Sequence, residues 1–423
     1  MADSSEVRAW LANTKSRGMS LGLTTTSAAL DALGQGTDAF TVHVAGSNGK
    51  GTLCATLAVA LQRAGVSTLM FTSPHLVRLE ERIRINGVPV SPATLDEALA
   101  RVMAVDEAMD GVLTFFESTF LAAMCVAETT GVEVLILETG LGGRLDATRC
   151  AHADMSVITS LSLEHTDILG PTLGHVAMEK GAIARPGRPL VVQTPADFNA
   201  RQAIEACAAN AGRADLNEPV GPAKLFWVTP DAGEGYRAQA KALVKAVWPH
   251  LGTVTKAPVP KLDTVRWPAR MQRISSAHPD EPNWLLEGAH NPSGMAKACE
   301  ELVEHTALQG RWALLFGTTP QTDLGTMVQP LLDLMKQHPP SLIVLTEPQE
   351  GRYPGVPCAT WLEVLTPVVN VPIVAHPLPQ DAVAHLNAHL DSGVTVLSIG
   401  SLYMQGNVLT VLGATSDEHL TVR

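Results

Sequence analysis

The chain has 423 residues, of which 46% are hydrophobic and 17% are charged, and its 30 basic and 42 acidic residues give a formal net charge of −12. At about 100–200 residues per domain this length predicts two domains, and the apolar content excludes a disordered protein. The acidic balance and the 4% of aromatic residues argue against nucleic-acid binding, which needs positive surfaces and stacking rings. An anionic ligand would therefore need a local positive site.

The sequence also argues against membrane insertion and secretion. No apolar run approaches the ~18 residues that span a bilayer, and the first residues lack the basic and apolar stretches of a signal peptide. The six cysteines are scattered without a C-x-x-C pair, which argues against a disulfide framework or structural zinc. We expect a cytoplasmic protein with reduced thiols packed in its core.

Short apolar segments rich in β-formers alternate with helical segments, which is typical of a parallel α/β architecture. In the first part of the chain we expect a helix over 52–64 and strands over 41–45, 66–71, 132–137, 157–161 and 189–193. Prolines interrupt 215–267, where we expect a helix over 238–248 and a linker over 256–262. Further strands are expected over 284–287, 312–316, 342–345, 373–375 and 394–399. The predicted domains are therefore 1–262 and 263–423.

The strongest local signal is a glycine-rich loop between an expected strand and an expected helix, formed by Gly46, Ser47, Asn48, Gly49, Lys50, Gly51 and Thr52. Glycines let backbone N–H groups surround phosphate oxygens, and a helix N-terminus adds positive potential. Lys50 would supply a charge for the phosphates and Thr52 a hydroxyl for magnesium. The string departs from G-x4-G-K-[ST], because Val44 replaces the first glycine and Gly51 separates Lys50 from Thr52. The alternative is a glycine-rich turn without a ligand.

A second signal is an acid at the end of a strand. The run 134–137 is apolar and Glu138 follows it, at the strand end where open α/β sheets bind ligands. Taken alone, Glu138 could equally be a surface acid. Next to a phosphate loop, a magnesium ligand is the better interpretation.

Together these strings resemble the folylpolyglutamate synthase/dihydrofolate synthase family of the Mur-type ATP-dependent ligases. The similar strings are GSNGKGT at 46–52, SPHL at 73–76, ERIR at 81–84, FE at 116–117, LETGLGGRLDAT at 137–148, EHTDILG at 164–170, EK at 179–180, WPAR at 267–270, GAHNP at 288–292 and GSLY at 400–403. The resemblance spans most of the chain, and the 138–148 string together with the H-N-P triplet is highly specific.

The resemblance implies an α/β fold of the Mur ligase type: a P-loop NTPase-like parallel-sheet domain followed by a smaller Rossmann-like domain, with ATP in the cleft. It implies a ligase that activates a folate-type carboxylate as an acyl phosphate, which the amine of L-glutamate then displaces. The product would be dihydrofolate from dihydropteroate, a longer folate polyglutamate, or both. The implied partners are a pterin or folate, L-glutamate and ATP. We expect the protein to be a monomer.

The resemblance also assigns roles to residues. Lys50, Lys180, His290 and Arg270 would be catalytic, with Lys180 carbamylated by carbon dioxide. ATP would be bound by residues 46–52, by Arg270 across the cleft, by Glu287 at the ribose and by Gln239 at the adenine. Two magnesium ions would be held by Thr52, Ser73, Glu138 and His165. The substrate would be bound by Leu21, Gly22, Thr114, Phe115, Phe116, Glu117, Leu145, Asp146 and Ala147.

Three departures from the family pattern leave alternatives open. The family's P-G-R reads Pro268-Ala269-Arg270, Glu287 replaces an aspartate, and Gln239 replaces an asparagine. If the lost glycine needed a positive φ, Ala269 would strain the turn. These changes leave open a divergent ligase that joins an amino acid to a non-folate carboxylate.

Plainer interpretations also stay open. The chain could be a P-loop switch, a kinase or a binding module, although a second domain carrying His290 and Arg270 argues against these. His165 could be a solvated loop histidine, and Lys180 an exposed partner of Glu179. Phe115 and Phe116 could be core residues, and Ser401 and Tyr403 could pack at a sheet end.

Overall fold

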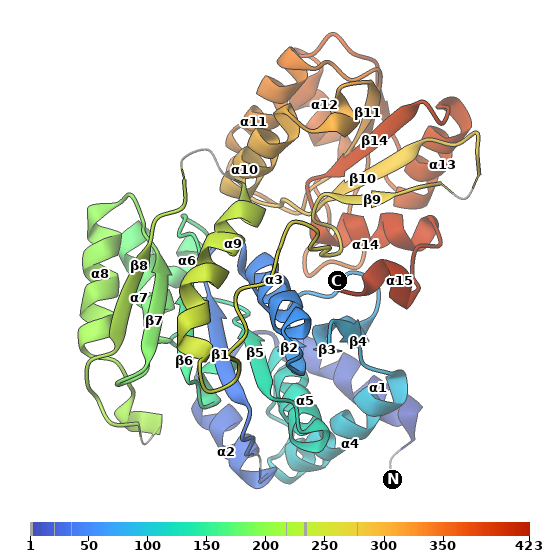
Figure 1. The fold of residues 1–423 in the computed structure, drawn as a ribbon. Coiled ribbons are helices and arrows are strands. Elements are labelled where there is room, and N and C mark those ends of the chain that lie inside the picture. Colours follow the sequence, from blue (N-terminus) through green and yellow to red (C-terminus); the bar gives the residue numbers. More distant parts are fainter. Residues whose placement is uncertain (1–2, 21, 35, 217, 232–234, 277) are drawn as a thin grey trace.

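The computed structural model describes residues 3–20, 22–34, 36–216, 218–231, 235–276 and 278–423. These residues form two α/β bodies, each built around one sheet, and the second body lies above the first in Figure 1. This arrangement confirms the predicted fold class. Among the described residues no helix has the length and apolarity needed to cross a bilayer, and all six cysteines are free.

The first sheet has the strand order β4-β3-β2-β5-β1-β6-β7-β8. Its strands are β1 (Phe40–Ala45), β2 (Thr68–Phe71), β3 (Ile83–Ile85), β4 (Val88–Pro89), β5 (Val134–Glu138), β6 (Met155–Ile158), β7 (Pro189–Gln193) and β8 (Lys224–Val228). All pairings are parallel except those of β3 with β2 and with β4. Because β1 lies between β5 and β6, the carboxyl ends of these three strands meet at one edge, where such sheets bind ligands.

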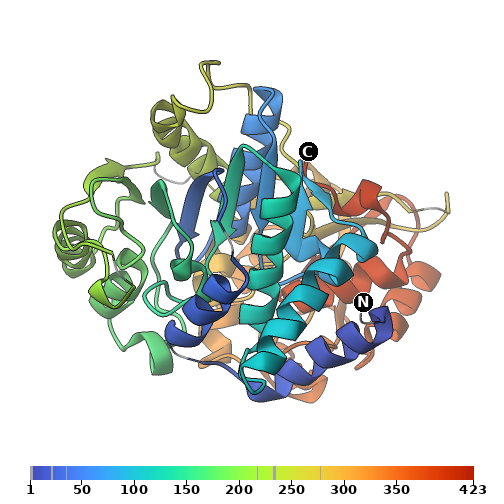
Figure 2. The ribbon, with the colours of Figure 1, turned by 90° about the horizontal axis from the view of Figure 1, so that it is seen from below.

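Helices cover both faces of this sheet. Successive strand residues point to opposite faces, so the central strands contribute side chains to two core clusters. Leu135 and Leu137 pack in one core cluster, whereas Val134 and Ile136 pack in another. The first cluster includes residues of α1 (Ser4–Thr14), α2 (Thr24–Ala32), α4 (Pro92–Ala108) and α5 (Phe115–Thr130). The second includes residues of α3 (Lys50–Arg63) and α9 (Tyr236–Val247). A third cluster joins α7 (Leu173–Gly181) and α8 (Phe198–Ala209) to β6 and β7. Figure 2 shows this body from below.

The second sheet has the order β13-β12-β11-β14-β10-β9, with only β9 antiparallel. Its strands are β9 (Gln272–Ile274), β10 (Asn283–Glu287), β11 (Arg311–Phe316), β12 (Ile343–Leu345), β13 (Ile373–Ala375) and β14 (Val394–Ile399). Helices α10 (Pro292–Val303), α11 (Leu324–Gln337) and α12 (Cys358–Leu365) pack on one face. Helices α13 (Pro379–His389), α14 (Leu402–Val411) and α15 (Asp417–Leu420) pack on the other.

Most of the expected strands are present, three of them with the expected bounds: 189–193, 373–375 and 394–399. The strand expected over 157–161 is wrong at its end, because β6 stops at Ile158. The next residues hold the phosphate loop instead: Ser47 N donates to Ser160 O at 2.8 Å, and Thr159 Oγ1 donates to Asn48 O at 2.7 Å. The sequence analysis missed β3, β4, β8 and β9, which are short strands or lie at the edges of the sheets.

Two chain segments connect the bodies. The first is the linker, residues 252–271. The predicted domain boundary at 262 lies within it and stays a prediction. The second is the segment 420–423, which returns from α15 to the first body. Val422 N donates to Gly87 O at 3.0 Å, and the backbones of Arg266 and Arg423 exchange hydrogen bonds of 2.5 and 3.3 Å. The returning segment is therefore paired with both the linker and the β3–β4 turn.

Candidate active site

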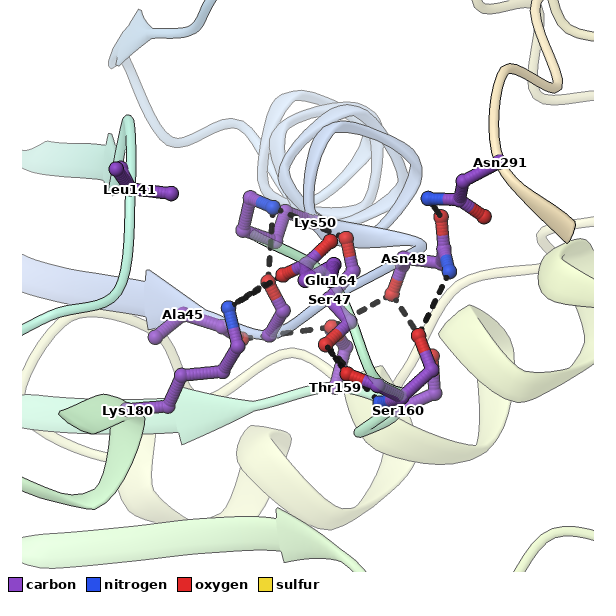
Figure 3. Close-up of polar contacts among 12 residues, drawn as sticks. Ala45, Ser47, Asn48, Lys50, Leu141, Thr159, Ser160, Glu164, Lys180 and Asn291 are labelled. Atoms are coloured by element: carbon purple, nitrogen blue, oxygen red, sulfur yellow. Dashed lines mark hydrogen bonds and ion pairs between the residues drawn. The ribbon is translucent and has the colours of Figure 1, made fainter. Parts of the chain in front are cut away.

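The predicted phosphate loop follows β1 and ends at the start of α3, as its sequence indicated. Gly46 has a φ of +146°, and a Cβ there would lie 1.8 Å from Thr159 Oγ1, so the site admits only glycine. Gly49 precedes α3 with a φ of +84°. Lys50 Nζ donates to Gly46 O at 2.8 Å and to Ser47 O at 3.2 Å. Its ammonium group is thus held over the loop, at the N-terminus of α3 (Figure 3).

Two aromatic residues that the sequence analysis missed lie against this loop. A Cβ on Gly49 would lie 3.3 Å from the Tyr236 ring, and a Cβ on Gly51 would lie 3.2 Å from the Trp267 indole. The Arg84 guanidinium lies 4.9 Å from the centre of the Trp267 ring. Trp267 begins the WPAR string, but nothing local marks either residue as a contact of the loop, because both approach it from distant segments. The loop is glycine-rich partly because these rings approach it closely.

Glu138 lies beside the loop, at the end of β5. The pairing of β1 with β5 places it opposite Val44, and its Oε2 accepts a 3.1 Å hydrogen bond from Ser73 N. Burial raises the pKa of Glu138, while the charges of Lys50, Arg270 and Arg82 oppose that rise. The fold thus brings Glu138, Lys50 and Arg270 together from three distant parts of the sequence.

The residues around Glu138 are suited to a hard cation. Glu138 is 5% exposed, and Ser73 N is the only donor to its side chain among the described residues. A buried carboxylate with one partner is costly unless a positive group is bound. Carboxylate and hydroxyl oxygens are the donors that magnesium prefers. No three His, Cys, Asp or Glu side chains converge in the described part of the chain, so the predicted set would rely on the hydroxyls of Thr52 and Ser73.

Lys180 is buried at the same place, which overturns the interpretation of it as an exposed partner of Glu179. Its side chain is 1% exposed, and Nζ donates to Glu164 Oε1 at 2.7 Å and to Gly46 O at 3.0 Å (Figure 3). Glu179 pairs with Arg144 instead. Burial lowers the pKa of Lys180, against the opposing charge of Glu164. Although burial opposes it, the charges of Lys180 and Lys50 lower the pKa of Glu164 to about 2. Carbamylation of Lys180 stays a prediction.

His165 stands at the start of α6 (Thr166–Leu169) with a φ of +45°. Its side chain is exposed. Partial loss of solvent lowers its pKa, and the charges of Lys180 and Lys50 lower it further against the opposing effect of Glu164. His165 therefore lies in the field of the phosphate loop. Its assignment as a metal ligand stays a prediction.

The second body contributes Arg270, Glu287 and His290. Glu287 ends β10 and is buried; its Oε2 accepts from Met271 N at 3.0 Å, and its Oε1 lies 3.4 Å from Arg270 Nη1. His290 Nδ1 lies 3.0 Å from Gly288 O. Burial lowers the pKa of His290 to about 4, and the charge of Arg270 adds to this. His290 is therefore neutral at pH 7, and because Gly288 O can only accept, the ring proton is on Nδ1.

Ala269 has the positive φ that the missing glycine suggested. Its φ is +55°, and it is fully buried. The left-handed region costs an L-residue with a side chain about 1–2 kcal/mol. The turn is held by Ala269 N donating to Gln272 Oε1 and by Gly288 N donating to Ala269 O, both at 2.8 Å. Gln239 is buried on α9, which begins beside the loop.

Several predicted substrate residues are engaged in holding the backbone. Thr114 and Glu117 form a reciprocal capping box at the start of α5, and Glu117 Oε1 accepts from Thr26 Oγ1 at 2.7 Å. Asp146 Oδ2 accepts from the backbone N–H groups of Gly140 and Leu141 at 2.8 and 2.9 Å. These three side chains therefore hold the backbone of α5 and of the 140–148 loop, and their substrate roles stay predictions.

Phe115 and Phe116, the two aromatic residues of the predicted substrate set, differ in their surroundings. Phe115 is half-buried, with Lys15 Nζ 5.3 Å and Arg82 Cζ 5.0 Å from its ring centre. Phe116 packs so closely that a Cβ on Gly140 would lie 2.6 Å from its ring. Both contact the core cluster of α4 and α5. Ala147 is buried, Gly22 and Leu145 are half-buried, and Leu21 lies outside the described residues.

Comparisons with known proteins lead to the family that the sequence strings resemble. No family model matches the chain. The dihydrofolate synthase/folylpolyglutamate synthase of Bacillus subtilis is 31% identical over 319 residues, which cover 68% of this chain and 73% of that protein. Two further curated relatives are matched over only 46% and 44% of their own length, so the chain spans less than half of those proteins.

Two solved structures resemble the whole chain. The FolC protein of Escherichia coli in complex with DHPP and ADP has a TM-score of 0.79 at 25% identity, covering 98% of this chain and 99% of that one. The bifunctional folylpolyglutamate synthase/dihydrofolate synthase of Yersinia pestis, complexed with AMPPNP and Mn ion, has a TM-score of 0.78 at 26% identity, covering 98% and 100%.

A glycine-rich loop between β1 and α3, together with a second α/β body that carries Arg270 and His290, defines a two-body α/β fold of the Mur ligase type. Within that class, the chain belongs to the dihydrofolate synthase/folylpolyglutamate synthase family.

Proposed function

We propose that the chain is an ATP-dependent ligase that phosphorylates a folate-type carboxylate and joins it to the amine of L-glutamate. The observation that carries the proposal is the meeting of Lys50 and Glu138 on one body with Arg270 on the other, since the charges of Lys50 and Arg270 both act on Glu138. The family membership and a neighbour complexed with DHPP and ADP support the substrate class.

In the proposed reaction, residues of the chain stabilise charge and position the reactants. Lys50 and Arg270 would hold the ATP phosphates from opposite sides while a carboxylate oxygen attacks the terminal phosphorus and ADP leaves. The amine nitrogen would then attack the acyl carbon and release phosphate. His290, neutral with Nδ1 bound to Gly288 O, presents Nε2 to accept a hydrogen bond from that amine.

Glu138, Ser73 and Thr52 would hold magnesium, and a neighbour complexed with AMPPNP and Mn ion supports a divalent ion at this site. Bound magnesium would neutralise charge on the phosphate oxygens. Lys180, His165, Glu287 and Gln239 keep the roles that the family resemblance implies. The substrate-side residues 114–117 and 145–147 would line the pterin pocket.

We further propose that the protein acts as a cytoplasmic monomer that binds no nucleic acid. Both sides of the cleft come from one chain, and the net charge of −12 repels polyanions. Light scattering with and without substrates tests whether the protein is a monomer. A concentration-dependent increase in mass that accompanies activity would contradict it.

The proposal is tested by incubating the protein with ATP, magnesium and L-glutamate while offering dihydropteroate or tetrahydrofolate in turn. We expect ADP release that depends on one or both acceptors, with a product heavier by one glutamyl residue. Dihydropteroate turnover alone would identify a dihydrofolate synthase, and turnover of both a bifunctional enzyme. If neither acceptor raises ADP release above background, the folate assignment is wrong and a ligase of another carboxylate takes its place.

A further inference from the structure

The side chain of Asn48 points out of the phosphate loop toward the second body. Its Oδ1 accepts from Asn291 Nδ2 at 3.0 Å, and its Nδ2 donates to Ser293 Oγ at 2.7 Å (Figure 3 shows the pair with Asn291). Nδ2 also lies 3.3 Å from Ser162 Oγ, which Ser293 Oγ contacts at 3.0 Å. One neutral amide thus connects the phosphate loop to the start of α10.

The backbone of Asn48 is also engaged. Its oxygen accepts from Thr159 Oγ1 at 2.7 Å and from Ser160 Oγ at 3.1 Å, and Asn48 and Ser160 form an isolated antiparallel bridge. The first body therefore holds the backbone of Asn48, and the side chain is directed to the second body.

The contacts on the second body place the predicted catalytic residues. Asn291 caps α10, with Oδ1 accepting from Gly294 N at 2.8 Å. It directly follows His290, whose ring is bound to Gly288 O. Gly288 N in turn donates to Ala269 O, next to Arg270. Any displacement of Asn291 relative to Asn48 therefore moves His290 relative to the phosphate loop, and Arg270 through the same turn.

We infer that Asn48 is a positioning residue: its amide docks the second body onto the phosphate loop and so sets the distance of His290 and Arg270 from the reacting phosphate. This inference rests on the proposed function. A neutral amide suits the task, because it adds no charge that would attract or repel the phosphates. Small errors in the placement of reacting groups are costly, and about 1 Å can lower a rate 10²-fold.

The decisive variant is Asn291→Ser. Serine still caps a helix, but its shorter side chain does not reach Asn48. We expect kcat to fall about 10- to 100-fold, while the Kd for AMPPNP stays within about threefold because Lys50 and the loop N–H groups are untouched. Ser293→Ala is the milder variant, with an expected loss of several-fold. Asn283→Ser makes the same exchange at the start of β10, where the Asn283 side chain bonds only Ser392 O among the described residues, and should leave both constants unchanged.

A double-mutant cycle with Asn48→Ala separates docking from other effects. If the two residues act through their shared contact, the double variant loses no more kcat than the more impaired single variant. Multiplied losses, or an AMPPNP affinity that falls in parallel with kcat, would overturn the inference. Thermal unfolding of each variant checks that the fold is retained.

Hydrogen exchange gives a readout that does not depend on catalysis. With AMPPNP bound, Asn291→Ser should increase exchange in both the phosphate loop and the first turn of α10, and Asn283→Ser in neither. If the wild-type chain proves inactive with folates, this exchange pattern still tests the docking contact. Unchanged exchange at both segments would refute the docking role, whatever the substrate.

Discussion

The two sides of the candidate site use their buried acids differently. On the phosphate side Glu138 accepts a hydrogen bond from a single backbone donor, so it has capacity for a ligand. On the predicted pterin side, Glu117 and Asp146 are saturated by contacts that hold α5 and the 140–148 loop. Of these three acids, the one with capacity for a ligand is therefore on the first side. The second side would recognise a flat ligand through its shape and the face of Phe115.

The largest expected effect is on the phosphate side. Lys50→Ala removes the ammonium group at the loop, and loss of one such group from a preorganised site costs on the order of 10²–10³-fold in kcat. We expect at least this loss in glutamate-dependent ADP release. Lys15→Ala, next to Phe115, serves as a comparison and should act mainly on the KM for the acceptor. Retained activity in Lys50→Ala would mean that the loop is structural.

The second test concerns the paired acid of the phosphate side, Glu164. Its pKa is about 2 in the fold and 4.5 without these contacts, which corresponds to about 3 kcal/mol of stability at neutral pH. Because the folded pKa is the lower one, this stability is present above pH 4.5 and is lost as the pH falls toward 2. Urea unfolding should show Glu164→Gln less stable than wild type by about 3 kcal/mol at pH 7. A difference that does not shrink at pH 3.5 would contradict this account.

The third test compares an acid from each side directly. Asp146→Asn turns an amide N–H₂ toward backbone N–H donors, and should lower the free energy of unfolding by about 1–3 kcal/mol. Glu138→Gln removes a buried charge that accepts only one hydrogen bond among the described residues, so it should leave stability unchanged or increase it by about 1 kcal/mol while abolishing turnover. Urea unfolding and ADP release measure both. Equal destabilisation by the two substitutions would remove the distinction between the sides.

The smallest expected effect lies across the cleft. Ala269→Gly relieves the left-handed strain of about 1–2 kcal/mol, and the lost methyl burial and added chain entropy offset roughly half of it. We expect a gain below about 1 kcal/mol in urea unfolding. Ala269→Val is the matched opposite and should destabilise the protein, because a β-branched residue is strongly disfavoured at positive φ. A Val variant as stable as the Gly variant would argue against strain in this turn.

The sequence predicted what depends on local strings. The loop 46–52 and the strand-end position of Glu138 follow from residue type and order. The positive φ at Ala269 was raised only as a condition, by comparison with the glycine of the family pattern. Contacts between distant segments were not predictable. Lys180 was compared with Glu179, although neighbours in a helix do not face each other, and its true partner is Glu164 from another loop. The contacts of Tyr236 and Trp267 with the loop likewise join segments that are far apart in the sequence. The bond between Asn48 and Asn291 arises only when the two bodies dock.

The segment 420–423 has a mechanical consequence. If a single linker joined the two bodies, the second body could rotate about several axes relative to the first. Val422 and Arg423 bond to Gly87 and Arg266. The bodies are therefore joined by two adjacent segments, the linker and the returning segment 420–423. Motion is then restricted mainly to rotation about the line of these contacts, which would bring Arg270 and His290 back over the phosphate loop along the same path in every cycle.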